Sequence, residues 1–147
     1  MTQEDKKLLL KDLCARLPYG IWLSIKDTFK YSTYPHSNVW IEPCSFQNLY
    51  DGLKGSVKDK LLKKIFKERP EEYLEIKPYL RPMSSMTEEE AKELDNFHTT
   101  IQIGFDTSEM FDSVGYVDWL NAHHFDYRGL IEKGLALEAP EGMYEEI

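Results

Sequence analysis

Two adjacent histidines followed by a carboxylate and a guanidinium form the densest group of chemically versatile side chains in this sequence. They are His123, His124, Asp126 and Arg128, in the run HHFDYR. Imidazoles and a carboxylate could bind a metal ion that activates water, as in a metal-assisted hydrolase or nuclease. Consecutive helical residues, however, project about 100° apart, and the HExxH spacing that places two ligands on one face is absent. We therefore predict no metal and no catalytic residue, and we keep these four residues as binding candidates.

Arg81 is the next candidate, because it stands between Pro78 and Pro82 in the run KPYLRP. A guanidinium held on stiff, extended chain loses little entropy when it binds an anion. The commoner role of a single arginine is to pair with a carboxylate or carbonyl of its own chain. That internal pairing is the favoured interpretation, and anion binding is the alternative.

A lysine-rich segment, residues 54–69, is the third candidate surface. It carries seven cations against Asp59 and Glu68, a net charge of +5, which leaves −13 for the rest of a chain whose total is −8. The favoured interpretation is the solvated face of an amphipathic helix. The alternative is a docking face for an acidic protein, an anionic lipid or nucleic acid, the last of which would make the chain a nucleic-acid accessory protein. The candidate binding residues on this helix are Lys58, Lys60, Lys63, Lys64 and Lys67.

Composition narrows the classes of protein that remain. A chain of 147 residues with 41% apolar side chains predicts a single domain, 1–147, with a short, flexible acidic tail at about 141–147. The net charge of −8 disfavours nucleic acid as a partner. Cys14 and Cys44 show no disulfide or metal spacing, and the start of the chain resembles neither a signal peptide nor a membrane span. These features predict a cytoplasmic protein. Glycine-rich phosphate-binding loops are absent, so we also predict no cofactor.

Apolar periodicity and capping residues predict the helices that position these candidates. The first runs from an N-cap at Thr2 to about Leu17, and the lysine-rich helix follows at 54–69. Thr87 begins another, with Glu90 completing a capping box. Asp112 or Ser113 caps a helix that reaches His124, and Asp126 caps a short last helix, YRGLIEKG, which ends at Gly134. HHFD is thus predicted to be the corner between two helices whose histidines diverge.

Four short runs of alternating apolar residues predict strands: GIWLSI, NVWIE, EYLEI and TTIQIGF. The stretch from Pro78 to Pro82 is predicted to be a stiff linker between strand and helix. The fold class is therefore α+β, a small antiparallel or mixed sheet of about four short strands packed with N-terminal, central and C-terminal helices.

Three stretches also carry a resemblance: LLLKDLCARLPYG, IKPYLRPMSSMTEEE and WLNAHHFDYRGLIEKGLALEAPEGMY. They resemble a family of short, uncharacterised acidic proteins encoded by gut anaerobic bacteria and their prophages or mobile elements. The resemblance implies a genomic context and brings no activity or catalytic residue with it. The chain departs from the family pattern between about Ser45 and Arg69, where the lysine-rich helix stands.

These observations together favour a small cytoplasmic binding or adaptor protein without catalysis, whose partner is another protein. The aromatic residues that we expect at its surface, a type enriched at recognition sites, include Tyr31, Tyr34, Trp40 and Tyr50. The metal-assisted hydrolase and the nucleic-acid accessory protein remain the alternatives, and no membrane association is expected.

Overall fold

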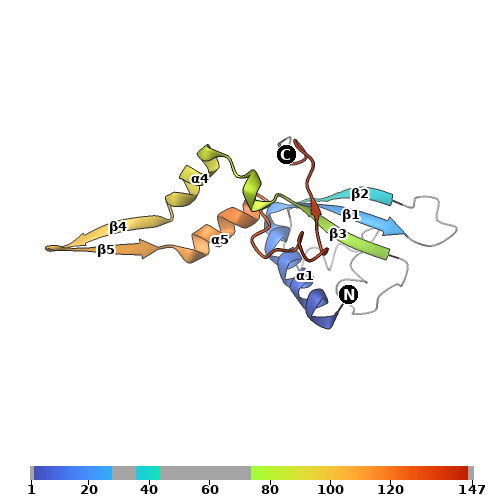
Figure 1. The fold of residues 1–147 in the computed structure, drawn as a ribbon, viewed down its shortest axis with the longest axis horizontal. Helices are drawn as coiled ribbons and strands as arrows, with labels where there is room; N and C mark the ends of the chain where they lie inside the picture. The colour runs from blue at the N-terminus through green and yellow to red at the C-terminus, as the bar shows by residue number, and fades with distance from the viewer. Residues whose placement is uncertain (1, 28–35, 44–73, 146–147) are drawn as a thin grey trace.

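A computed structural model describes residues 2–27, 36–43 and 74–145 of the chain. It consists of a four-stranded mixed sheet packed against a long N-terminal helix, with a two-stranded hairpin that extends away from this body (Figure 1). The predicted α+β fold is confirmed. The predicted lysine-rich helix at 54–69 lies outside the described residues.

Helix α1 (Gln3–Arg16) begins as the sequence predicts. The Thr2 side chain accepts a hydrogen bond from the Asp5 N–H, and the Asp5 carboxylate accepts one from the Thr2 N–H, which makes a complete capping box. Pro18 has no N–H to continue the helix, and the chain passes into a short 3-10 turn, η1 (Leu17–Tyr19). The buried side of α1 presents Leu9 and Leu13 to the sheet.

The sheet has the strand order β2-β1-β3-β6. Strand β1 (Ile21–Asp27) pairs antiparallel with β2 (His36–Ile41) and with β3 (Leu74–Leu80), and the short β6 (Leu137–Glu138) adds parallel to β3. Strand β3 continues through Pro78, so the predicted linker between Pro78 and Pro82 is wrong over its first half. A proline's fixed φ is compatible with extended backbone, and the ring breaks a sheet only where its missing N–H is needed.

The main core lies between α1 and one face of the sheet. Ile21, Leu23 and Ile25 alternate inward along β1, and Ile76 and Leu80 lie on the same face of β3. The loop after residue 125 completes this core with Leu130, Leu135 and Ala136. The opposite face of the sheet carries the intervening, mostly polar and aromatic side chains of the strands.

The hairpin and two helices at its base form a projection that we call the arm, residues 87–122 (Figure 1). Its elements are α4 (Glu88–Asp95), β4 (His98–Ile103), β5 (Asp106–Phe111) and α5 (Ser113–Ala122). The predicted strand TTIQIGF is confirmed as β4, but it pairs with β5, which the sequence did not predict, and stays outside the main sheet. A turn at Gly104, with φ 64°, brings the two strands together.

A second, smaller core joins α4 to α5 at the base of the arm. Leu94, Leu120 and Phe125 are buried together, and Phe97 and Trp119 pack against them. Thr87 and Glu90 form the predicted capping box of α4, and the Asp112 side chain caps α5 as predicted. The arm is therefore held firmly at its base.

The predicted short helix YRGLIEKG does not form. Its residues make a series of turns in which Gly129 and Gly134 adopt left-handed φ values of 73° and 74°. The Asp126 carboxylate accepts hydrogen bonds from the N–H groups of Leu130 and Ile131, four and five residues ahead, instead of capping a first helical turn. Backbone hydrogen bonds are thus satisfied by a side chain where the glycines interrupt helical geometry.

Within the described part of the chain, no helix combines the length and apolar character needed to cross a bilayer.

Candidate functional site

The backbone brings Arg81 and the histidine corner together. Arg81, just beyond β3, forms a parallel bridge with Phe125. The Arg81 N–H donates to the His124 carbonyl at 2.7 Å, and the Asp126 N–H donates to the Arg81 carbonyl at 2.8 Å. Residues that are more than forty positions apart in the sequence thus lie side by side. Their side chains, however, leave this junction in different directions.

The Arg81 side chain is committed to an internal partner, as the favoured interpretation predicted. Both terminal nitrogens donate to Glu90, each at 2.7 Å, and the guanidinium lies 4.2 Å above the centre of the Phe125 ring. These hydrogen bonds lower the pKa of Glu90 from 4.5 to about 2. The pair ties the first turn of α4 to the end of β3, so Arg81 holds the arm on the body.

His123 faces the arm. Its ring stacks on Trp119 with centroids 3.8 Å apart, and its Nδ1 lies 2.8 Å from the Trp119 carbonyl oxygen. Its Nε2 lies 4.0 Å from a carboxylate oxygen of Glu93, which also accepts a hydrogen bond from the Trp119 indole. His123 therefore belongs to the contact between α4 and α5.

His124 faces the opposite way, toward the C-terminal segment. Its ring is buried and stacks on Tyr144 with centroids 3.7 Å apart. Burial, with a smaller effect from the Arg16 charge, lowers the pKa of His124 from 6.5 to about 3, so the imidazole is neutral near pH 7. His124 is the one non-glycine residue with positive φ, 64°, among the described residues, and it makes the sharp turn after α5.

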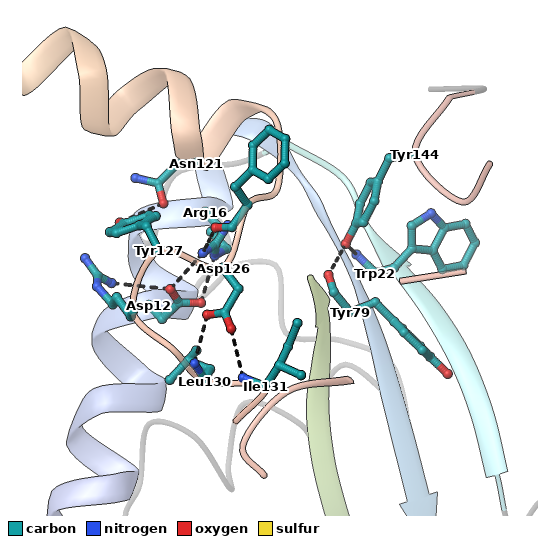
Figure 2. A network of polar contacts seen from close by, with 12 residues as sticks. Asp12, Arg16, Trp22, Tyr79, Asn121, Asp126, Tyr127, Leu130, Ile131 and Tyr144 are labelled. Carbon is teal, nitrogen blue, oxygen red and sulfur yellow. Dashed lines mark hydrogen bonds and ion pairs between the residues drawn. The ribbon is translucent and has the colours of Figure 1, made fainter. Parts of the chain in front are cut away.

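Behind the corner lies a buried ionic group that the sequence did not reveal (Figure 2). Asp12 and Arg16 of α1 are both fully buried and joined by two hydrogen bonds, at 2.8 and 3.0 Å. Arg16 also donates to the Phe125 carbonyl at 2.7 Å, and Arg128 approaches Asp12 at 3.4 Å. The spacing of Asp12 and Arg16 could have predicted this pair, because an acidic and a basic residue four positions apart on a helix are neighbours. It was overlooked because the buried side of α1 was expected to be entirely apolar.

These contacts assign structural roles to the histidine corner. The two imidazoles diverge, as predicted, and the Asp126 carboxylate accepts from two backbone N–H groups. Arg128 stacks on Tyr127, with its guanidinium 4.9 Å from the ring centre, and reaches Asp12. In the described residues no three histidine, cysteine, aspartate or glutamate side chains are arranged to hold a metal ion. The histidine corner, residues 123–126, therefore connects the arm to the sheet and to helix α1.

The lysine candidates cannot be placed in this architecture. Lys58, Lys60, Lys63, Lys64 and Lys67 all lie outside the described residues. The nucleic-acid accessory role built on them stays a prediction.

The arm offers the most exposed apolar surface in the described structure. Five large apolar side chains are exposed on it: Phe105, Met110, Phe111, Val114 and Val117. Phe105, at the tip of the hairpin, is completely exposed, and Val114, on α5, is 70% exposed. Outside the arm, the single large apolar side chain of comparable exposure in the described ranges is Met83. Sequence reasoning missed this surface because it expected β4 to join the sheet.

Comparison of the chain with protein-family models, curated proteins and solved structures found no match.

Proposed function

We propose that the protein is a non-catalytic binding protein that engages a partner protein through its arm, and that the partner presents a basic surface with an apolar patch. The observation that carries this proposal is the coincidence, on residues 87–122, of exposed apolar side chains with the net negative charge of the molecule.

Exposed apolar side chains support a recognition role. Large exposed apolar side chains concentrated on one part of a surface mark interaction sites, whereas those scattered singly over a protein need no explanation. Val114 and Val117 are three residues apart and lie on one side of α5, next to the strand that carries Met110. Phe105 stands at the far end of the hairpin. The apolar groups are therefore spread along the arm from tip to base.

The distribution of charge supports a basic partner. The arm holds nine carboxylates and one cation, Lys92, a net of −8. The other 111 residues hold seventeen carboxylates and seventeen cations, a net of zero. Complementary potentials speed encounter and select partners, so a surface of this sign favours a positively charged one.

The hairpin itself is a strand template. In the described structure β4 and β5 pair only with each other, so each strand has an outer edge with free backbone groups. An isolated two-stranded hairpin is only marginally stable in water, and addition of a partner's strand would satisfy those groups. Strand β5 carries the charged residues Asp106 and Glu109, which disfavour addition of another strand at its edge, whereas β4 carries no carboxylate or lysine.

The base of the arm supports the same role, because it supplies rigidity. The Arg81–Glu90 pair fixes α4 on the body, and the Trp119–Glu93 hydrogen bond and the small core hold α4 and α5 together. A prepositioned surface loses less entropy on binding than a mobile one. The free thiol of Cys14 is compatible with the reducing cytoplasm that we propose as its location, and prophage association remains part of the proposal.

The proposal is tested by photocrosslinking in the native host. A benzoylphenylalanine placed at position 105 reports contacts of the hairpin tip, and one placed at Met83 is the matched control, because Met83 is exposed but outside the arm. We expect a discrete crosslinked protein of basic isoelectric point from position 105 and not from position 83. Phe105→Ser together with Met110→Ser should abolish its copurification.

Two results would overturn the proposal. One is recovery of the chain alone after crosslinking at position 105, in repeated preparations at low salt. The other is a partner that the arm variant retains as well as the wild type does, which would place the binding surface elsewhere.

A further inference from the structure

The face of the sheet opposite α1 contains a cavity that the binding role of the arm does not use. Its volume is about 430 Å³, within the usual range for small-molecule sites. Strands β1, β2, β3 and β6 all contribute to it. The lining residues are Ser24, Lys26, His36, Glu75, Lys77 and Leu137.

The cavity gathers hydrogen-bond donors from three strands. Ser24 and Lys26 are on β1, His36 is on β2 and Lys77 is on β3. The pairing register explains why they meet: Lys26 is opposite His36, and Ser24 is opposite Lys77. Ser24 is buried, with 6% of the residue exposed, and its hydroxyl lies 3.0 Å from Nε2 of His36. A hydroxyl, an imidazole and two ammonium groups therefore border one space.

The charge of this space is positive in an acidic protein. Lys26 and Lys77 contribute two positive charges, and Glu75, whose carboxylate lies 3.0 Å from the Lys77 ammonium, contributes one negative charge. Glu75 is paired with Lys77 and is also the cross-strand neighbour of Lys26, so the three side chains together leave a net charge of +1. Leu137 of β6 adds an apolar wall, which an inorganic anion would not need but the carbon skeleton of a larger molecule would contact.

We infer that this cavity binds a small molecule that carries a phosphate group. Lysine binds phosphate as a point charge, and hydroxyl and imidazole donors complete its coordination. Donors that approach from three strands suit the tetrahedral oxygens of a phosphate better than the planar oxygens of a carboxylate. The phosphate sits between Lys26 and Lys77 above Ser24, and the rest of the molecule lies against Leu137. This inference is independent of the arm and of its partner.

The experiment is a titration of the full chain, followed by amide chemical shifts, with three probes: glycerol 3-phosphate, glycerate and inorganic phosphate. We expect glycerol 3-phosphate to shift amides of β1 and β3 around Ser24 and Lys77 and to saturate. Glycerate, with a similar skeleton and a carboxylate, should bind at least about tenfold more weakly. Inorganic phosphate should bind at the same residues with lower affinity, because it lacks contact with Leu137.

Variants separate the cavity from general attraction to lysines. Lys26→Met with Lys77→Met should weaken glycerol 3-phosphate binding by about tenfold or more. Lys92→Met with Lys133→Met, which removes two exposed lysines elsewhere, should leave it unchanged, and Lys77→Arg should keep most of it. Circular dichroism verifies that each variant is folded. The inference is overturned by absence of saturable shifts in the wild type, by equal loss in both double variants, or by glycerate binding as tightly as glycerol 3-phosphate.

Discussion

Tyr144 stacks on His124, and its hydroxyl bridges β1 and β3 at the end of the sheet where the two strands no longer pair with each other. Its ring lies parallel to the imidazole, at an interplanar angle of 13°, and its hydroxyl donates to the Tyr79 carbonyl at 2.6 Å while accepting from the Trp22 N–H at 3.1 Å. The antiparallel pairing of β1 with β3 begins one residue further, at Leu23 and Pro78. The phenol thus takes the place of a backbone pair, and the C-terminal segment, the sheet and the histidine corner meet at one side chain.

Replacement of Tyr144 by phenylalanine should lower the free energy of unfolding by about 1 to 3 kcal/mol, since it leaves the partly buried Trp22 N–H and Tyr79 carbonyl without their partner. Urea denaturation measures the change. Tyr116→Phe is the control, because the Tyr116 hydroxyl makes no hydrogen bond within the described structure while its ring packs against Phe97. Equal stability of Tyr144→Phe and the wild type would show that the hydroxyl is dispensable.

His124 should make stability fall as the pH drops below neutrality. Its pKa is about 3 in the folded protein against 6.5 for the free side chain. Between these two pH values the unfolded chain therefore binds a proton at this histidine and the folded protein does not. The contribution is complete above pH 6.5 and is lost as the pH falls toward 3. From pH 7 to pH 5 the loss should be about 2 kcal/mol.

His124→Asn should remove this dependence, because asparagine does not titrate and tolerates the left-handed backbone at this position. Urea midpoints at pH 7 and pH 5 give the comparison, and His98→Asn, at an exposed histidine, should retain the wild-type dependence. A His124→Asn protein that loses as much stability as the wild type over this interval would contradict the assignment.

Glu90 should act in a more acidic interval. Its pKa of about 2, lowered chiefly by the hydrogen bonds from Arg81, means that its stabilisation is present above pH 4.5 and disappears as the pH falls toward 2. Glu90→Gln should cost about 1 to 2 kcal/mol at pH 7 and flatten the acid limb of the stability curve. Glu89→Gln, at the exposed neighbouring position, should do neither. Thermal melts at pH 7, 4 and 3 distinguish the two variants.

The buried Asp12–Arg16 pair should respond very differently to single and double replacement. Asp12→Ala leaves a fully buried guanidinium without its counterion and should cost about 3 to 5 kcal/mol. Asp12→Leu combined with Arg16→Met removes both charges and should recover part of that loss, although the Phe125 carbonyl then lacks its donor. Chemical denaturation of Asp12→Leu, of Arg16→Met and of the double variant completes a double-mutant cycle, which gives the coupling. Independent, additive losses would argue against a shared network.

Gly20 should tolerate no side chain. Its φ is 82°, and an added Cβ would collide with the ring of Trp40. Gly129 has a similar φ, 73°, but open space where its Cβ would point. Gly129→Ala therefore isolates the backbone strain, about 1 to 2 kcal/mol, and Gly20→Ala adds the steric cost. Thermal denaturation should rank the variants in that order, and equal melting temperatures would contradict the close packing at Trp40.

The sequence predicted the elements whose ends carry local chemical signals. Thr2 with Asp5 and Thr87 with Glu90 supply their own caps, and Asp112 caps α5. Alternation of Ile21, Leu23 and Ile25 predicted β1 for the same reason: one face is buried, and the pattern records it.

Elements without a buried face were not predictable in this way. Strand β5 is exposed along its whole length, so the residues from Asp106 to Phe111 show no alternation of apolar and polar types. The loop 127–134 has apolar residues at helical spacing, but Gly129 and the backbone hydrogen bonds to Asp126 override that pattern.

The candidate site shows the same limit. The sequence predicted that His123 and His124 diverge, but it assigned the divergence to helix geometry. In the structure α5 ends at Ala122, and the left-handed backbone of His124 turns its ring away from that of His123. The pairing of Arg81 with Glu90 was predicted only as a type of contact, because its partner depends on how α4 packs against β3. Cavity residues such as Ser24 and Lys77 come together through strand register alone, and register across separate segments is not encoded in either segment by itself.

The placement of all the net charge in the arm has a consequence for how the molecule meets its surroundings. Because residues 87–122 carry −8 and the rest of the chain sums to zero, a cationic surface attracts the arm, with its hairpin, more strongly than an equal charge spread over the whole chain would be attracted to one place. Association through the arm should therefore become slower as added salt shortens the range of this attraction.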